Sequence, residues 1–163
     1  MAKVTGKQGA AAALAIFVAA AAALPDIKKW EGLILTPQPD RLAYDIPNVC
    51  YGETRVEMRT YTAEECEALA KMALTQDFGP AVVACVPALG RPERKHQLMA
   101  SMLLSYNIGK SAFCRSTVAR RFNAGDIRGG CDAMLMWRFA GGREVRGLLN
   151  RRRDERRICL EGV

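Results

Sequence analysis

The sequence predicts an α+β protein, in which a small β-containing lobe near the N-terminus is followed by a larger, mainly helical lobe. Three observations predict this arrangement. An uncharged, alanine-rich run covers residues 9–24, proline and glycine divide the next part into short pieces up to about Thr60, and helical signals dominate from Thr62 onward. The 163 residues provide for one compact domain.

The N-terminal segment begins like an export signal. Lys3 and Lys7 precede the uncharged run from Gln8 to Pro25. The run is mostly alanine and is marginal for crossing a bilayer, which takes about 20 apolar residues. Three interpretations stay open: a cleaved signal peptide with Ala-x-Ala sites around residues 20–23, an uncleaved anchor that later leaves the membrane, and a buried core helix. The first two deliver residues 26–163 to the periplasm, so we separate residues 1–25 as an N-terminal segment.

Residues 26–60 carry the expected β structure. Prolines at positions 25, 37, 39 and 47, with Gly32 and Gly52, limit the length of any regular element here. We expect a short helix from Asp26 to Leu35 that leads into a small hairpin, with a strand-like fragment at Asn48–Tyr51.

The remaining chain is predicted to be helical. Thr62 and Glu65 form a capping-box pattern at the start of a helix that runs to about Gln76. Ser116 and Asp126 have the position and chemistry of helix N-caps. The expected later helices are residues 93–105, residues 117–123, a helix beginning at Asp126, and residues 143–159.

The charge of the chain favours anionic partners. A formal net charge of +7 fits nucleic acid, anionic lipid or the bacterial cell wall. The basic run at residues 151–157 is interrupted by Asp154 and Glu155. It also lacks the aromatic residues on which the bases of a single-stranded nucleic acid would stack. We therefore expect a solvated helix face there, no nucleic-acid partner, and a monomer.

The cysteine pattern predicts disulfides. No two cysteines form a CxxC pair, and the single histidine, His96, is distant from all of them, so we expect no metal site and no cofactor. An even number of scattered cysteines favours an oxidising compartment, whereas free thiols in a cytosolic protein are the alternative. Fifteen pairings are open for the six cysteines, which are Cys50, Cys66, Cys85, Cys114, Cys131 and Cys159.

Two carboxylates have a spacing that suits glycoside hydrolysis. This reaction uses one proton donor and one base or nucleophile on opposite sides of the scissile bond. Glu31 follows Trp30 and precedes an apolar stretch, and a low-dielectric setting helps a catalytic acid to remain protonated. Asp40 follows after eight residues, although such a spacing also arises by chance.

Glu31 and Asp40 belong to an ordered series of segments along the chain. These segments are residues 31–40, 48–54, 62–66, 105–109, 116–117, 122–126, 141–143, 147–148, 151–152 and 155–156. The series resembles phage-type lysozymes, glycoside hydrolase family 24, and in particular the signal-anchor-release endolysins of lambdoid phages. The resemblance implies a lysozyme-like fold and hydrolysis of the β-1,4 bond between N-acetylmuramic acid and N-acetylglucosamine in peptidoglycan, which causes host cell lysis.

The resemblance also implies residue roles. Glu31 would be the general acid, and Asp40 would orient or activate the attacking water. Asn48 stands where the family usually has a threonine that helps to hold this water, and asparagine can also hydrogen-bond water. The loop from Arg41 to Pro47 is about two residues longer than usual, which makes Asp45 an alternative to Asp40.

Further expectations come from the same resemblance. Tyr51, Glu53, Asn107 and Thr117 would line the substrate cleft. Relatives suggest disulfides between Cys50 and Cys66 and between Cys131 and Cys159, which leaves Cys85 and Cys114 as the third pair.

Two other functions remain open at this point. A lytic transglycosylase would need no residue to position water, and Asn48 in place of threonine keeps this alternative in view. A membrane-tethered protein could also act on the wall or membrane through its basic surface without catalysis. For the lysozyme, a weak inner-membrane anchor offers control: Glu31 lies only seven residues after Leu24, so the cleft would assemble after the segment leaves the membrane for the periplasm.

Overall fold

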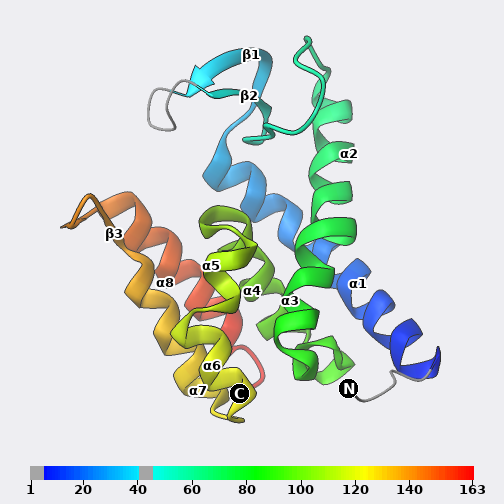
Figure 1. Ribbon diagram of the computed structural model, residues 1–163, viewed down its shortest axis with the longest axis vertical. Coiled ribbons are helices and arrows are strands. Elements are labelled where there is room, and N and C mark those ends of the chain that lie inside the picture. The colour runs from blue at the N-terminus through cyan, green and yellow to red at the C-terminus, as the bar shows by residue number, and fades with distance from the viewer. Residues whose placement is uncertain (1–5, 41–45) are drawn as a thin grey trace. The chain divides into compact units, whose positions relative to one another are not determined.

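The computed structural model describes residues 6–40 and 46–163 (Figure 1). The chain divides into two compact units. The small unit comprises Leu24–Ala73, and the helical unit joins residues 1–23 to Leu74–Val163. The chain therefore enters the helical unit first, builds the small unit, and then returns to complete the helical unit.

The first element is one long helix, α1, from Gly6 to Glu31. The expected short helix from Asp26 to Leu35 is therefore wrong at both ends. The high helix propensity of the alanine run carries the helix through Pro25. The helix stops at Glu31 because Gly32 has a φ of +71°, a left-handed conformation that glycine adopts without strain.

The small unit contains the predicted hairpin. Strand β1 (Ile34–Asp40) pairs antiparallel with β2 (Ile46–Cys50), and an irregularity lies between Ile34 and Gln38. The Thr62–Glu65 capping box is confirmed: the Thr62 amide donates to Oε2 of Glu65 at 2.8 Å, and the Glu65 amide donates to Oγ1 of Thr62 at 3.2 Å. Helix α2 then spans Ala63–Ala73, and a π-helical turn, η1 (Leu74–Phe78), replaces its expected last residues.

The helical unit is built around α4 (Lys95–Ile108), which packs against α8 (Arg146–Leu160). Leu98, Leu103 and Leu104 of α4 are at most 1% exposed. The predicted N-caps are confirmed, because Ser116 accepts from the Ala119 amide and Asp126 from the Gly129 amide. The other elements are α3 (Gly79–Cys85), η2 (Pro87–Gly90), η3 (Pro92–Arg94), α5 (Lys110–Cys114), α6 (Thr117–Asn123), α7 (Ile127–Ala133), η4 (Met134–Trp137), β3 (Phe139–Ala140) and β4 (Arg143–Glu144).

The expected start of the last helix at Arg143 is also wrong. Arg143 and Glu144 pair with Ala140 and Phe139 in the short β3–β4 hairpin, so α8 cannot begin before Arg146. This hairpin turns at Gly141 and Gly142, whose φ values are both positive.

The N-terminal part of α1 packs on the helical unit, where two glycines make room for it. A Cβ added at Gly79 would collide with the Ile16 side chain and would lie 2.7 Å from the Leu74 carbonyl oxygen. A Cβ added at Gly90 would lie 3.1 Å from Cβ of Ala12. The buried residues of this face of α1 are Ala15, Ile16, Ala19, Ala20 and Ala23.

Three disulfides connect elements within the units. Cys50–Cys66 joins β2 to α2 in the small unit, with a Cα–Cα distance of 4.9 Å. Cys85–Cys114 and Cys131–Cys159 lie in the helical unit. These are the three pairs that the family resemblance implies.

The basic run of α8 is not a solvated face throughout, which corrects the expectation from sequence. Arg151 is 4% exposed, Arg152 is fully buried, and Glu155 is 1% exposed. Residues three and four apart lie on one side of a helix, so Glu155 forms ion pairs with both Arg151 and Arg152. Arg153 and Arg157 do face solvent.

Candidate active site

Glu31 is the last residue of α1, and its carboxyl group lies beside the turn that follows β2. A Cβ added at Gly52 would stand 3.9 Å from Oε2 of Glu31, and Oε1 is buried. Gly52 has a φ of +81°, a conformation that other residues rarely adopt. The backbone at Gly52 therefore passes close to the carboxyl group without a side chain between them.

The turn beside Glu31 is held by backbone and covalent contacts. Val49 and Glu53 exchange two amide-to-carbonyl hydrogen bonds of 3.0 and 2.8 Å. Cys50 has a positive φ of 60°, the only such value among the described residues other than glycine, and its side chain is bonded to Cys66. The disulfide thus ties this turn to α2.

The hairpin brings Asp40 and Asn48 onto one ladder. Asp40 pairs with Ile46, and Gln38 pairs with Asn48, so the two candidates stand two register positions apart. Oδ1 of Asn48 is buried and accepts no hydrogen bond from the described residues. The alternative carboxylate, Asp45, lies outside the described residues, as does the rest of the loop between β1 and β2, residues 41–45.

Tyr51 and Glu53, expected to line the cleft, are 4% and 7% exposed. Both lie within the small unit, in the turn next to Glu31. Their burial favours a supporting role for this turn over broad contact with a sugar chain.

Asn107 and Thr117 belong to the helical unit. Asn107 is exposed near the end of α4, and its Oδ1 accepts a hydrogen bond from Nη2 of Arg152 at 3.0 Å. Thr117 is the first residue of α6, and its hydroxyl contacts Nη2 of Arg120 at 3.2 Å.

The contact with Asn107 belongs to a buried cluster that the sequence analysis did not identify as a site. Oε1 of Glu155 accepts from Arg151 at 3.1 Å and from Arg152 at 2.9 Å. The cluster therefore orients the side chain of Asn107 through the hydrogen bond from Arg152. The spacing of residues 151, 152 and 155 is the sequence signal that could have indicated it.

Lys28 lies one turn before Glu31 and forms an ion pair with Glu67 of α2. The contacts with Lys28 and then Lys71 lower the pKa of Glu67. The pair connects the end of α1 with α2 inside the small unit.

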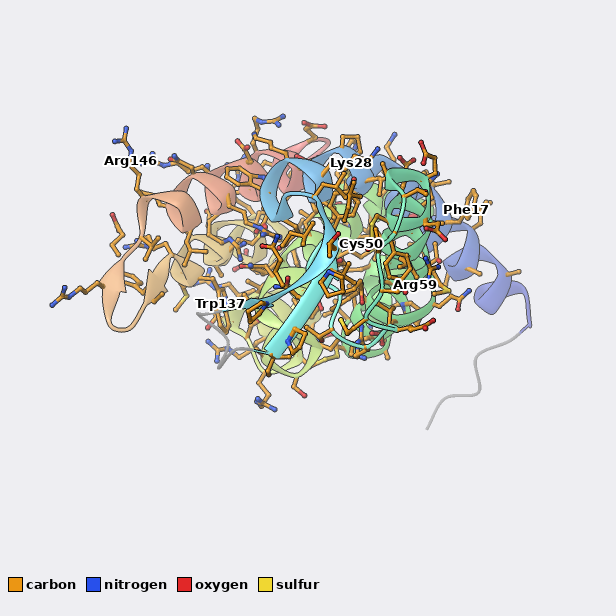
Figure 2. The ribbon with its side chains drawn as sticks, turned by 90° about the horizontal axis from the view of Figure 1, so that it is seen from above. Phe17, Lys28, Cys50, Arg59, Trp137 and Arg146 are labelled. Carbon is orange, nitrogen blue, oxygen red and sulfur yellow. A yellow bond between two sulfur atoms is a disulfide. The ribbon has the colours of Figure 1, made fainter. Side chains whose placement is uncertain are left out.

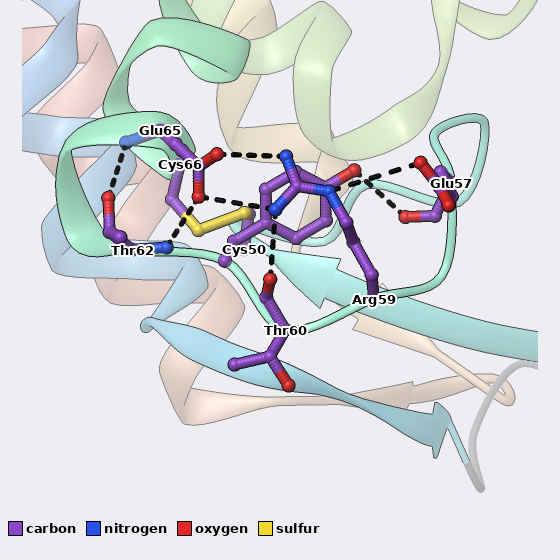
Figure 3. A network of polar contacts seen from close by, with 8 residues as sticks. Cys50, Glu57, Arg59, Thr60, Thr62, Glu65 and Cys66 are labelled. Atoms are coloured by element: carbon purple, nitrogen blue, oxygen red, sulfur yellow. Dashed lines mark hydrogen bonds and ion pairs between the residues drawn. A yellow bond between two sulfur atoms is a disulfide. The ribbon is translucent and has the colours of Figure 1, made fainter.

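Arg59 organises the loop before α2 (Figure 3). Its guanidinium group lies 3.9 Å from the centre of the Tyr61 ring and donates to Glu65 at 2.8 Å and to the Thr60 carbonyl at 2.9 Å. The hydrogen bond from Arg59, followed by that from the Thr62 amide, lowers the pKa of Glu65. The Tyr61 amide donates to the Leu35 carbonyl at 2.9 Å, which fixes this loop against β1.

Within the described ranges, no group of three or more histidine, cysteine, aspartate or glutamate residues could hold a metal ion. By length and composition, residues 9–31 form one helix that could cross a membrane.

Comparison with known proteins gives a consistent result. Residues 28–155 match the family model described as phage lysozyme. A protein named SAR-endolysin from Enterobacteria phage P21 is 36% identical over 137 residues, which cover 81% of this chain and 78% of that protein.

Solved structures agree with the sequence relatives. The crystal structure of a point mutant of P22 lysozyme superimposes with a TM-score of 0.71 at 29% identity and covers 98% of this chain and 99% of its own. The muramidase domain of SpmX from Asticaccaulis excentricus gives a TM-score of 0.69 at 30% identity, with coverage of 85% and 95% respectively. The predicted lysozyme-like fold is therefore confirmed.

Proposed function

This chain belongs to the phage lysozyme family and is a peptidoglycan-degrading endolysin, and from this premise we propose that it hydrolyses the β-1,4 bond between N-acetylmuramic acid and N-acetylglucosamine. One observation carries the proposal. The Glu31 carboxyl group lies beside the disulfide-tethered turn at Gly52, in a unit whose hairpin carries Asp40 and Asn48.

In the proposed reaction, Glu31 donates a proton to the glycosidic oxygen as the bond to the leaving sugar breaks. Asp40 orients or activates the water that attacks the anomeric carbon. The buried Oδ1 of Asn48 has no partner among the described residues, which supports a role in accepting a hydrogen bond from this water. No metal or cofactor takes part in this scheme.

The side chains of Asn107 and Thr117 are proposed to contact the glycan from the helical unit. Asn107 is held by the buried Arg152, so its amide has a fixed orientation before substrate binds. Tyr51 and Glu53 are proposed to support the turn beside Glu31 and to approach the substrate only with their polar ends.

The N-terminal segment is proposed to hold the enzyme at the inner membrane before release into the periplasm. The relatives named SAR-endolysin and the apolar length of α1 support this sequence of events. Glu31 lies on the same helix as the apolar run, so withdrawal of that run from the membrane also changes the surroundings of Glu31. Control is then topological, because the segment contains no cysteine for disulfide exchange.

Mass spectrometry of digested, purified peptidoglycan tests the reaction. Hydrolysis leaves reducing N-acetylmuramic acid ends, which we expect. Anhydro ends would identify a lytic transglycosylase instead, and the absence of soluble fragments would favour a binding protein without catalysis.

The second carboxylate is tested by comparing Asp40→Asn with Asp45→Asn in the same digestion. We expect Asp40→Asn to lower the rate by a factor on the order of 10²–10⁴, the usual contribution of a positioned acid or base. Loss of activity in Asp45→Asn alone would assign the role to Asp45. Asn48→Thr should remain active, whereas Asn48→Ala should lose activity.

A further inference from the structure

The arginines of α8 differ in exposure, and a buried one contacts a residue that is proposed to bind the glycan. Arg146, the first residue of α8, is exposed and extends away from the ribbon (Figure 2). Arg152 is fully buried instead, and its Nη2 donates to Oε1 of Glu155 at 2.9 Å and to Oδ1 of Asn107 at 3.0 Å. A buried cation therefore reaches the exposed amide of Asn107 from inside the helical unit.

The chemistry of Arg152 decides which end of the Asn107 amide it contacts. A guanidinium group stays protonated and has only donors, so the amide oxygen must face it. The Nδ2 group is attached to the same carbon as this oxygen and points away from Arg152, and it donates to no other residue that the structure describes. The oxygen is thus engaged inside the protein, whereas the two N–H bonds are available to a ligand.

The contact between α4 and α8 holds this arrangement in place. Near the start of α4, the buried Nε2 of Gln97 donates to the Cys159 carbonyl at 2.6 Å, and Cys159 is bonded to Cys131. Near the end of α4, Arg152 donates to Asn107. Because the two helices are joined at both ends of their contact, the amide keeps its orientation before substrate binds, which lowers the entropy cost of binding.

Thr117, the second glycan-binding candidate of the helical unit, has the same polarity. Its hydroxyl oxygen accepts a hydrogen bond from Nη2 of Arg120 at 3.2 Å. A hydroxyl group that accepts from an arginine keeps its own proton for another partner. Both candidates of this unit therefore have donors left for the substrate, which suits acceptor oxygens and disfavours groups that can only donate.

We propose that Arg152 is a positioning residue that makes Asn107 a hydrogen-bond donor toward the substrate, so that the enzyme selects an acceptor oxygen at this place on the strand. The acceptor is an acetamido carbonyl of the glycan or a carboxylate of its stem peptide. The ammonium group of a de-N-acetylated sugar has only donors and is selected against. This inference rests on the proposed function, because it takes peptidoglycan to be the substrate.

Asn107→Asp tests the donor, because it keeps an oxygen for Arg152 and replaces the NH2 group with a second oxygen. We expect KM for soluble peptidoglycan strands to rise about tenfold with little change in kcat, since the lost contact acts on substrate binding. Asn150→Asp is the matched control, because Asn150 is exposed on α8 of the same unit and receives the same charge. It should have the KM of the wild type.

Melting temperatures test the orientation of the amide without any substrate. Asn107→Asp should melt above Asn107→Ala, because the aspartate accepts a charge-assisted hydrogen bond from Arg152, whereas Asn107→Ala removes this acceptor from a buried donor. Both variants lack the NH2 group, so both should raise KM. A role of Asn107 in stability alone would change the melting temperatures and leave KM as it is.

A double-mutant cycle tests Arg152 itself. Arg152→Lys keeps a positive charge for Glu155 but loses the planar fork that reaches both partners, so the Asn107 amide is free to turn. We expect KM to rise about threefold in Arg152→Lys and to change no further when this substitution is added to Asn107→Asp, because both act through the same NH2 group. Additive effects on KM would contradict the assigned positioning role.

Two altered substrates identify the acceptor oxygen. On strands whose stem peptides have been removed by an amidase, the difference in KM between the wild type and Asn107→Asp should persist for an acetamido acceptor and vanish for a stem carboxylate. On de-N-acetylated strands, an acetamido acceptor predicts that Asn107→Asp binds better than the wild type, because a carboxylate accepts from an ammonium group. Either pattern supports donation by Asn107.

Three results would overturn the inference: an unchanged KM in Asn107→Asp, an equal rise of KM in Asn150→Asp, and a melting temperature of Asn107→Ala at or above that of Asn107→Asp. If the wild type releases no fragments from the strands, the proposed function fails instead, and the melting temperatures still show whether Arg152 holds the Asn107 oxygen. Should Arg152→Lys fail to fold, the variants of Asn107 and their control still decide.

Discussion

The two units differ in charge and in what holds them together. The helical unit has 18 lysine and arginine residues against eight acidic ones, a formal charge of +10, whereas the small unit has six against nine, or −3, which together give the +7 of the chain. The helical unit holds two disulfides and buried leucines of α4, while the small unit combines one disulfide and a hairpin with its own buried apolar residues, such as Ile27 and Val49. The positive charge is therefore concentrated in the helical unit, whereas the proposed acid, Glu31, lies in the small unit.

The largest stability effect should come from the buried cluster of the helical unit. Glu155→Gln removes the negative charge that both buried arginines contact, and breaking such a pair costs about 3–5 kcal/mol. Urea unfolding measures this loss. The control Glu161→Gln alters only surface pairs with His96 and Arg157 and should change the free energy of unfolding by less than about 1 kcal/mol. An equal loss of unfolding free energy in the two variants would contradict the claim that the buried ion pairs stabilise the protein more than the exposed ones.

The next effect should be confined to the small unit. Removing the Cys50–Cys66 disulfide by the double change to alanine releases a loop of 16 residues, for which chain entropy predicts about 3 kcal/mol. Hydrogen exchange should accelerate at residues 46–66 before it does so in α4. Uniform acceleration in both units would show that they unfold as one.

A smaller effect is expected where α1 meets the helical unit. Gly79→Ala places a Cβ against Ile16 and the Leu74 carbonyl, and overpacking of this kind costs about 1–3 kcal/mol. Thermal unfolding measures the loss. Gly147→Ala is the matched control in α8, because no atom lies within 4 Å of its added Cβ. A destabilised Gly147→Ala with an unaffected Gly79→Ala would argue against this packing of α1.

The smallest effect concerns pH and the Arg59 network. The pKa of Glu65 in the folded protein is lowered from 4.5, chiefly by the hydrogen bond from Arg59, so its contribution to stability is present above pH 4.5 and disappears as pH falls through the folded-state pKa. Hydrogen exchange at the Thr62 and Glu65 amides should therefore show faster opening below that pH. Arg59→Gln should weaken this pH dependence, and an unchanged profile would exclude the network as its cause.

Local chemistry explains what the sequence could predict. The Thr62–Glu65 box and the caps Ser116 and Asp126 depend on residues three positions apart, and the structure has all three. The α1 boundaries were missed because Pro25 is normally a break, and the alanine run overrides it. The buried state of Arg152 was missed because burial depends on the partner helix α4, which lies about 45 residues earlier in the chain.

The candidate site likewise combines features that local residues predict with features that depend on contacts between distant segments. The sequence predicts that Glu31 lies in a helix that leads into a hairpin, but the expected end of that helix at Leu35 is four residues beyond the observed end at Glu31. Its closeness to Gly52 and the seclusion of Tyr51 and Glu53 depend on the disulfide and on the positive φ of Cys50, which no local pattern predicts.

The most direct test of the account is the rate at which Glu31→Gln releases fragments from purified peptidoglycan, with Glu64→Gln as an exposed control on α2 of the same unit. The account predicts that Glu31→Gln loses activity by a factor on the order of 10²–10⁴ while its circular dichroism spectrum and melting temperature stay unchanged. Glu64→Gln should cleave like the wild type. Full activity in Glu31→Gln would contradict the account, because no other residue is assigned to donate the proton.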